Sequence, residues 1–411
     1  MTRIISKNLL MTSGLVTAGL MLLAGCSAGS SNTASEDAAA PSASEDLGNC
    51  GTLPVHWPED PDGVLDRLPE EVRAAYNGYR GTLHASPWAD WTPEGPGPYR
   101  VAIVFTETGP PYQAALLQET VGLLEADELI ESVRVTEAGK DAATQVSNFQ
   151  AAIRDGVDII LYQPVQADAL TPFIDQAAEQ GIPSIAMQGK SDSANSVDVM
   201  PNPYLLAARP AAEVVKMMGG EGTLLAVRGL LGTPIETESF AGIEAVVSEC
   251  PGITLDGTSV VGNYSAATAK SEVQKYLSTH PSPLGGVIHS AIMGPGIIQA
   301  FSDSGRELPP FGDPAMTEGV AAYWNEHQSD FRVAGSGQGA AAIAGVIAEV
   351  TLRMLKGDGL LISDVVLEPP LVTEENIAEW AVGAVDLGSA ASLEPPAGTY
   401  PPAGFIDGIF G

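Results

Sequence analysis

The sequence predicts an α/β fold made of two Rossmann-like lobes, each built on a parallel sheet. From Arg100 onwards, short apolar runs rich in β-branched residues alternate with helical patterns of about 10 to 15 residues. This alternation indicates parallel strands joined by right-handed crossovers. The same rhythm starts again after Pro203. A chain of 411 residues is long enough for two compact lobes of similar plan.

The first lobe is expected to begin with the run RVAIVF, at 100–105. Its pattern predicts further strands and intervening helices in a regular order. The strands are expected at 133–137, 158–164 and 182–187, and the helices at 113–126, 141–154 and 168–180.

The second lobe is expected to begin with a helix from Pro203 to about Met218, which the break GGEG ends. The predicted strands lie at 223–229, 253–261 and 285–290, and the predicted helices at 235–249 and 266–279. The pattern then continues to a long helix expected at 340–355. In open parallel sheets, ligands bind beyond the carboxyl ends of the strands. Two lobes that face each other would therefore enclose a ligand in a cleft.

Residues 1–25 are predicted to be a signal peptide. They have a positively charged start, and their apolar run at 9–23 is shorter than the ~20 residues that a spanning helix needs. The sequence Leu-Ala-Gly-Cys at 23–26 resembles the lipobox of bacterial lipoproteins. That resemblance implies that Cys26 is acylated and anchors the protein to the outer face of the cell membrane. The alternative is a plain signal peptide with an incidental cysteine.

Two further segments precede the lobes. Residues 26–46 are expected to form a flexible tether, because they contain no large apolar side chain with which to build a core. Residues 47–98 are rich in proline, acidic and aromatic residues, with one helical pattern near 69–79, and are expected to form an ordered extension. The tryptophans of this extension either pack on a lobe or cover a ligand.

The cysteines beyond the lipobox are Cys50 and Cys250. In an exported protein two remaining cysteines are commonly paired. We therefore expect a disulfide that attaches the extension to the body of the protein. The alternative is two unpaired thiols.

Composition and motifs argue against several functional classes. The formal net charge of −32 makes nucleic acids and anionic lipid headgroups poor partners. The histidines show no metal-binding spacing, and the chain has no GxSxG elbow, no Walker loop and no GxGxxG after the first strand. We expect no catalytic residue, no cofactor and no metal.

The stretch VSNFQAAIRDGVDIILYQPVQADALTPFIDQAAEQGIPSIAM resembles the first lobe of the type I periplasmic solute-binding proteins of the ribose-binding kind, the extracytoplasmic receptors of ABC importers. The resemblance spans roughly residues 99–370. It implies two lobes joined by a three-crossing hinge near Asn202, Gln338 and Asp364. Lobe 1 is then expected at 99–203 with 339–364, and lobe 2 at 204–338 with 365–411.

The resemblance also implies the positions that line the cleft. Asp313 corresponds to the cleft aspartate of the family and Gln338 to its hinge glutamine. Tyr112 and Tyr264 stand where aromatic residues are expected. The family often has Asp-Arg after the fourth strand, where this chain has Gln188-Gly189. In a turn of the second lobe, the arginine that is usual in the family corresponds to Thr237. The candidate ligand-binding residues are therefore Tyr112, Gln188, Thr237, Tyr264, Asp313 and Gln338.

Several of these assignments have structural alternatives. Asp313 would be a helix cap if a helix starts near Met316, and Gln338 would be a hinge residue that bonds only the backbone. The two tyrosines are also compatible with a packing role, and Gln188 and Thr237 rest on the resemblance alone.

The departures from the family pattern bear on the ligand. A pocket that lacks an arginine and an asparagine cannot make the same hydrogen bonds to a pyranose, and one buried hydroxyl is worth ~1 to 3 kcal/mol. Ribose is therefore not favoured, and a modified sugar, a polyol or another small neutral metabolite is expected.

The resemblance implies that the chain is a monomer that captures this ligand and delivers it to a membrane permease. The alternatives are a sensor lipoprotein that signals to a membrane receptor or kinase, and a surface lipoprotein whose cleft has another use.

Overall fold

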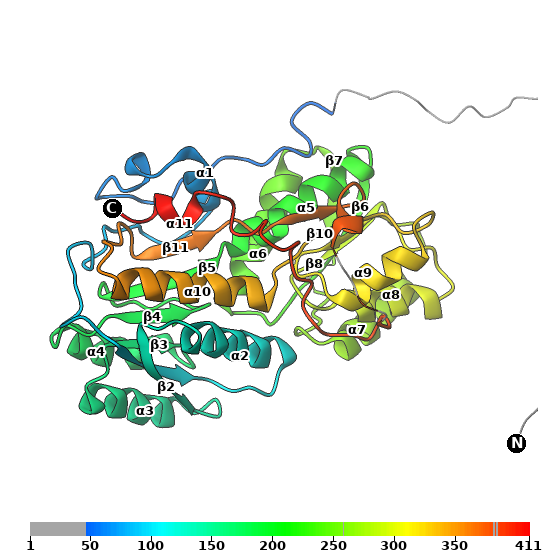
Figure 1. Cartoon of the computed structure of the whole chain (residues 1–411). Coiled ribbons are helices and arrows are strands. Elements are labelled where there is room, and N and C mark those ends of the chain that lie inside the picture. Colours follow the sequence, from blue (N-terminus) through cyan, green and yellow to red (C-terminus); the bar gives the residue numbers. More distant parts are fainter. Residues whose placement is uncertain (1–46, 258, 381–382, 384) are drawn as a thin grey trace, which may run out of the picture. The chain divides into compact units, whose positions relative to one another are not determined.

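The computed structural model describes residues 47–257, 259–380, 383 and 385–411. It contains two six-stranded sheets, with strand orders β11-β5-β4-β3-β1-β2 and β12-β10-β9-β8-β6-β7 (Figure 1). All neighbouring strands run parallel except the short β12, which pairs with β10 in the antiparallel sense. The predicted α/β fold with two parallel sheets is therefore confirmed. The predicted signal peptide, Cys26 and the tether lie outside the described residues.

The first sheet contains the predicted strands in the predicted order, together with two strands that the sequence pattern missed, β5 and β11. Its strands are β1 Tyr99–Phe105, β2 Ile130–Glu137, β3 Ile159–Tyr162, β4 Ser184–Met187, β5 Ser196–Pro201 and β11 Asp364–Leu367. The helices around it are α2 Pro111–Glu125, α3 Ala142–Asp155, α4 Ala167–Ala178 and α10 Ala340–Leu355.

The second sheet has the same plan. Its strands are β6 Glu221–Val227, β7 Gly252–Asp256, β8 Gly286–His289, β9 Phe311–Asp313, β10 Val333–Ser336 and β12 Leu371–Thr373. The helices around it are α5 Pro203–Met217, α6 Pro234–Ser248, α7 Ala266–Thr279, α8 Gly294–Asp303 and α9 Glu318–Glu326, with a short 3-10 turn, η3, at Ile377–Glu379.

The inner strands of each sheet are buried on both faces, which is why they read as continuous apolar runs, whereas the edge strands β2 and β7 are largely exposed or half-buried. In β1, Val101 and Ile103 face a core shared with α2 and α10, whereas Ala102 and Val104 face a core shared with α3 and α4. The second sheet repeats this arrangement, with α5 and α6 over one face and α7, α8 and α9 over the other. Burial of each large side chain contributes about 1.5 to 3 kcal/mol.

The chain passes between the two sheets where β5 leads into α5, where β10 leads into α10 and where β11 leads into β12. The assignment of 365–411 to lobe 2 needs correction at two places. Strand β11 pairs with β5 through Leu367, because its apolar residues complete the core of the first sheet. The C-terminal helix α11 Phe405–Gly408 also packs into that core (Figure 1).

The N-terminal extension is an ordered part of the body. The helix expected near 69–79 forms as short pieces, α1 Glu70–Arg73 and the 3-10 turn η2 Ala74–Tyr76, after another 3-10 turn, η1, at Leu65–Arg67. Its apolar residues, from Val64 to Trp88, belong to the core of the first sheet. Of the two alternatives for the tryptophans, Trp88 therefore packs on a lobe.

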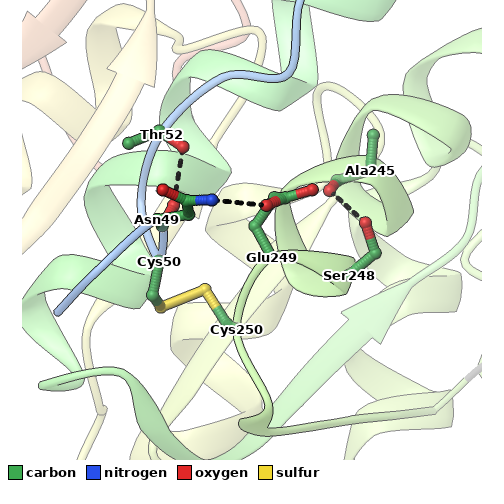
Figure 2. The surroundings of a disulfide bond; sticks show 7 residues. All are labelled: Asn49, Cys50, Thr52, Ala245, Ser248, Glu249 and Cys250. Carbon is green, nitrogen blue, oxygen red and sulfur yellow. Dashed lines mark hydrogen bonds between the residues drawn. A yellow bond between two sulfur atoms is a disulfide. The ribbon is translucent and has the colours of Figure 1, made fainter.

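A disulfide joins the extension to the second sheet. Cys50 is bonded to Cys250, which follows α6 (Figure 2). Both cysteines are buried in a core that α5 and α6 share with the second sheet. Beside the bond, Nδ2 of Asn49 donates to Oε2 of Glu249 at 3.4 Å. The extension therefore contacts the second sheet at Cys50 and the first sheet from Val64 onwards.

We predict that Cys50→Ser combined with Cys250→Ser lowers the free energy of unfolding by about 2 to 4 kcal/mol, because the unfolded chain loses a long covalent loop. Urea unfolding of the two proteins under oxidising conditions measures the difference. Adding a reductant should destabilise the wild type and leave the double variant unchanged. Equal unfolding midpoints for the oxidised wild type and the variant would contradict the prediction.

Candidate functional site

The candidate residues follow the carboxyl ends of parallel strands. Tyr112 lies at the start of α2, after β1, and Gln188 directly follows β4. In the second sheet, Asp313 ends β9 and Gln338 follows β10. Parallel strands bring their carboxyl ends to one edge of a sheet, where ligands bind in open α/β folds. Both sheets therefore present polar side chains at the edge that can hold a ligand.

Tyr112, Gln188 and Gln338, here the Tyr112 group, form a polar cluster. Nε2 of Gln188 donates to Oη of Tyr112 at 2.8 Å. Burial raises the pKa of the Tyr112 hydroxyl, and hydrogen bonding with the side chains of Gln188 and Gln338 opposes the rise. The group offers carboxamides and a phenol, which both donate and accept hydrogen bonds.

The backbone at Gln188 is in the left-handed region, with φ +53°. Its N–H donates to the carbonyl of Val199 in β5 at 2.8 Å, so the neighbouring strand holds this conformation. A non-glycine residue with positive φ is uncommon and is often found at functional sites. The turn directs the Gln188 side chain to Tyr112.

Amide side chains extend this polar region along the edge of the first sheet. Oγ1 of Thr106, after β1, donates to Oε1 of Gln163, after β3, at 2.8 Å. Nε2 of Gln163 donates to Oε1 of Gln113 at 2.8 Å, and its backbone carbonyl accepts from Gln145 at 2.6 Å. The sequence pattern alone does not distinguish these residues, although Gln113 and Gln163 lie at or near the ends of predicted elements.

The C-terminal tail brings two residues near the Tyr112 group that sequence analysis missed. Glu394 accepts hydrogen bonds from the N–H groups of Ala341 and Ala342, at 3.1 and 3.2 Å, in the first turn of α10. Its negative charge also raises the pKa of Tyr112. Burial raises the pKa of Tyr400, and Tyr112 adds to that rise. The sequence gives only an indirect sign of this contact. Helix α10 begins after Gly339, which has no side chain to accept from the first N–H groups, so another residue must do so.

Asp313 lies beside His289 rather than in the Tyr112 group. Oδ1 of Asp313 is 3.1 Å from Nε2 of His289, and both side chains are almost fully buried. Within the described ranges, neither side chain has a hydrogen-bond partner that satisfies normal geometry. The alternative that Asp313 caps the next helix is wrong, because Thr317 accepts from the N–H of Val320 and caps α9. Asp313 thus remains a buried acceptor at the end of β9.

Thr237 and Tyr264 are not brought into the Tyr112 group. Thr237 is exposed on α6. Tyr264 has φ +55°, and its ring lies so close to Gly229, after β6, that a Cβ at Gly229 would be 2.4 Å from the ring. The Tyr264 ring therefore packs against the end of β6.

A charged cluster lies next to the β4 turn. Nζ of Lys190 is 2.8 Å from Oη of Tyr79 and 3.0 Å from Oδ1 of Asp364. Burial raises the pKa of Glu238 on α6, and the positive charges of Arg80 and Lys190 oppose that rise. Charged groups of the extension, of the first sheet and of α6 therefore interact electrostatically in this cluster.

The described residues contain neither a cluster suited to a metal ion nor a helix suited to crossing a membrane. No cluster of at least three histidine, cysteine or acidic side chains with metal-binding geometry occurs among them. None of the helices in these ranges combines the length and apolar character that a membrane span requires.

Comparisons with known proteins point to one family. Residues 101–359 match a family model described as a periplasmic binding protein domain. The chain is 27% identical over 243 residues to the xylitol-binding protein of Mycolicibacterium smegmatis, a match that covers 58% of this chain and 68% of that protein. It is 22% identical over 207 residues to the ribose import binding protein of Escherichia coli, over 48% of this chain and 69% of that protein.

Solved structures show the same fold. An ABC transporter solute binding protein from Bacillus halodurans with bound myo-inositol has a TM-score of 0.59 and 16% identity, over 70% of this chain and 98% of that one. Another from Mycobacterium smegmatis with bound glycerol has a TM-score of 0.57 and 19% identity, over 72% and 99%.

The buried Asp198, next to the Lys190 cluster, should make stability depend on pH. Burial and the nearby Asp364 raise the pKa of Asp198 to about 7. Between about pH 4 and 7, the folded chain therefore holds a proton that the unfolded chain has released. The free energy of unfolding should fall as pH rises through this window, by about 1.4 kcal/mol for each unit of pKa difference.

Urea unfolding at several pH values tests this prediction. The variant Asp198→Asn should lose this decline, whereas Asp192→Asn, at an exposed position nearby, should keep it. A wild type and an Asp198→Asn variant with parallel pH profiles would show that Asp198 does not titrate in this window.

Proposed function

Because the chain belongs to the periplasmic binding protein domain family, we propose that it is the extracytoplasmic, lipid-anchored binding component of an ABC importer. It captures a small neutral ligand with several hydroxyl groups, such as a sugar, a modified sugar or a polyol. The observation that carries the proposal is the Tyr112 group, which gathers uncharged donors and acceptors from separate segments at the end of a parallel sheet.

The relatives support a neutral ligand. Two are named for xylitol and for ribose, and two structures of the same fold contain myo-inositol and glycerol. The chain is a solute-binding protein and not an enzyme.

The side chains suit a polyhydroxylated molecule. Each hydroxyl group both donates and accepts, and the carboxamides of Gln188 and Gln338 can do the same. The ring of Tyr112 offers an apolar face for C–H groups. Asp313 offers a buried acceptor from the second sheet. A charged ligand would lack a partner of opposite charge in the Tyr112 group.

Capture is proposed to proceed by closure of two lobes. We place lobe 1 at residues 99–203, 339–367 and 405–411 and lobe 2 at 204–338 and 368–404, so that β11 and α11 lie with lobe 1. Hinge motion about the passages near Asn202, Gln338 and Pro369 would bring Asp313 towards the Tyr112 group and remove water from the ligand. The closed monomer would then present both lobes to the permease.

The lipid anchor completes the proposal. Acylation of Cys26 would hold the binding domain at the outer face of the membrane, close to the permease, and each buried methylene contributes ~0.8 kcal/mol to membrane binding. The alternative role as a sensor is not favoured, because the curated relatives named above include an import protein.

The first prediction concerns the ligand. Polyols such as xylitol and myo-inositol should raise the melting temperature of the wild type. Gln188→Ala should weaken binding of the active polyol about 2- to 13-fold, because one neutral hydrogen bond is worth about 0.5 to 1.5 kcal/mol. Isothermal calorimetry measures this change.

The matched control is Gln328→Ala, since Gln328 is exposed and lies after α9, outside the Tyr112 group. It should bind as the wild type does. If no sugar or polyol stabilises the wild type, or if both glutamine variants bind equally, the proposed function is wrong.

The second prediction concerns the anchor. In cells, Cys26→Ser should move the protein from the membrane fraction to the soluble fraction, because the acceptor of the acyl chains is lost. Detergent phase partitioning followed by immunoblotting measures this. Cys50→Ser is the control and should stay with the membrane. Membrane association that survives Cys26→Ser would refute the lipid anchor.

A further inference from the structure

A cavity of about 460 Å³ lies where the extension meets the first turn of α5. Its walls are two segments of the extension, 56–59 and 78–82, together with Tyr204. Backbone hydrogen bonds fix the segments side by side, from the N–H of Gly78 to the carbonyl of His56 at 2.7 Å and from that of Leu83 to Glu59 at 2.8 Å. The volume is typical of a small-molecule site, about 300 to 1,000 Å³.

The lining side chains have unused hydrogen-bonding capacity. The ring nitrogens of His56 and Trp57, the carboxylate of Glu59 and the guanidinium of Arg80 form no hydrogen bond or ion pair with any residue that the structure describes. By contrast, the hydroxyl of Tyr79, in the same segment, is bonded to Asp364 at 2.7 Å. The exposed side chains of the cavity can therefore bond a ligand without breaking a hydrogen bond or ion pair within the described chain.

Tyr204 provides the clearest sign of a missing partner. Its side chain is 3% exposed, and its hydroxyl is buried without a hydrogen-bond partner in the described part of the chain. The ring lies against Gly78, where a Cβ would be 2.1 Å from it. Burial raises the pKa of the Tyr204 hydroxyl, and the positive charge of Arg80, which also lines the cavity, opposes that rise. Buried hydroxyls are nearly always bonded, which makes this one a candidate ligand contact.

The chemistry of the walls defines the ligand. Arg80, Tyr204 and Trp57 can donate hydrogen bonds, and Glu59 can accept them. The indole of Trp57 is 52% exposed and offers a flat apolar face. Arg80 and Glu59 carry opposite charges at the wall of the cavity, so these two side chains together select neither an anion nor a cation. Mixed donors and acceptors beside an aromatic face suit a neutral sugar ring.

We propose that this cavity is an accessory carbohydrate site, which binds a neutral sugar ring over Trp57 with its hydroxyl groups on Arg80, Glu59 and Tyr204. The site contains none of the residues of the Tyr112 group. It therefore stands independently of the proposed function. A free sugar and the end of a polysaccharide offer the same ring, so the test includes both sources.

The test uses the full chain carrying Gln188→Ala, so that the Tyr112 group contributes less to binding. The probes are methyl β-D-glucopyranoside, xylitol and a linear glucose tetrasaccharide, followed by calorimetry and tryptophan fluorescence. A sugar should bind this protein with a dissociation constant in the millimolar range or tighter. Adding Trp57→Ala should weaken that binding at least about 10-fold, and Arg80→Gln should weaken it by a similar factor.

Matched controls are Val55→Ala and Arg67→Gln, which change an apolar and a charged residue of the extension outside the cavity. They should leave binding unchanged. Stronger binding of the tetrasaccharide than of the monosaccharide would indicate a polysaccharide end as the ligand. The proposal is overturned if no probe binds the Gln188→Ala chain, or if Trp57→Ala and Val55→Ala bind equally.

The outcomes for the two sites are distinguishable. Binding that depends on Gln188 but not on Trp57 supports the cleft alone and refutes the accessory site. Binding that depends on Trp57 but not on Gln188 supports the accessory site and refutes the role given to the Tyr112 group. Unfolding midpoints of the Trp57→Ala and Arg80→Gln variants equal to that of the parent chain exclude misfolding as the cause of any loss.

Discussion

The parallel direction of the strands is the constraint on which the site depends. A parallel strand must be followed by a crossover, so the carboxyl ends of β1, β3 and β4 all lie at one edge, with a helix or a turn beginning there. The side chains of Tyr112, Gln163 and Gln188 are placed by this rule, although they lie far apart in the sequence. The second sheet repeats the arrangement and places Asp313 and Gln338 at its own edge. Without parallel pairing these groups would not meet.

The extension is as much a part of the body as the lobes are. Nδ2 of Asn202, at the passage from β5 to α5, donates to the carbonyls of Ala75 and Asn77 at 2.8 and 2.9 Å. The hydroxyl of Tyr76 donates to the carbonyl of Asp364 at 2.7 Å. Residues that precede the first strand therefore hold one passage between the sheets, at Asn202, and the start of β11, the strand that leads to another passage. A change in the extension would be felt at the hinge, because a buried hydrogen bond left without its partner is costly.

Local patterns predicted the fold well and the long-range contacts poorly. The helices Ala266–Thr279 and Ala340–Leu355 have the predicted bounds, because apolar spacing and flanking residues mark their ends. Strand β5 was missed, since polar residues precede a short apolar run that carries an aspartate. The contact of Gln188 with Tyr112 was expected only through resemblance. The contact of Glu394 with the start of α10 could not be predicted. The C-terminal tail has no helical or strand periodicity, and the residues that Glu394 bonds lie more than fifty positions earlier in the chain.

The disulfide also decides where a mechanical load enters the molecule. The covalent ring closed by Cys50 and Cys250 contains the extension, β1 to β6 and α6. Tension on the chain ahead of Cys50 can pass through the sulfur atoms directly to the end of α6. The segments inside the ring are then bypassed and carry no obligatory share of that force. A pull from the N-terminal side would thus load the end of α6 directly, and the covalent bypass spares only those strands of the first sheet that precede Cys250, because β11 follows it.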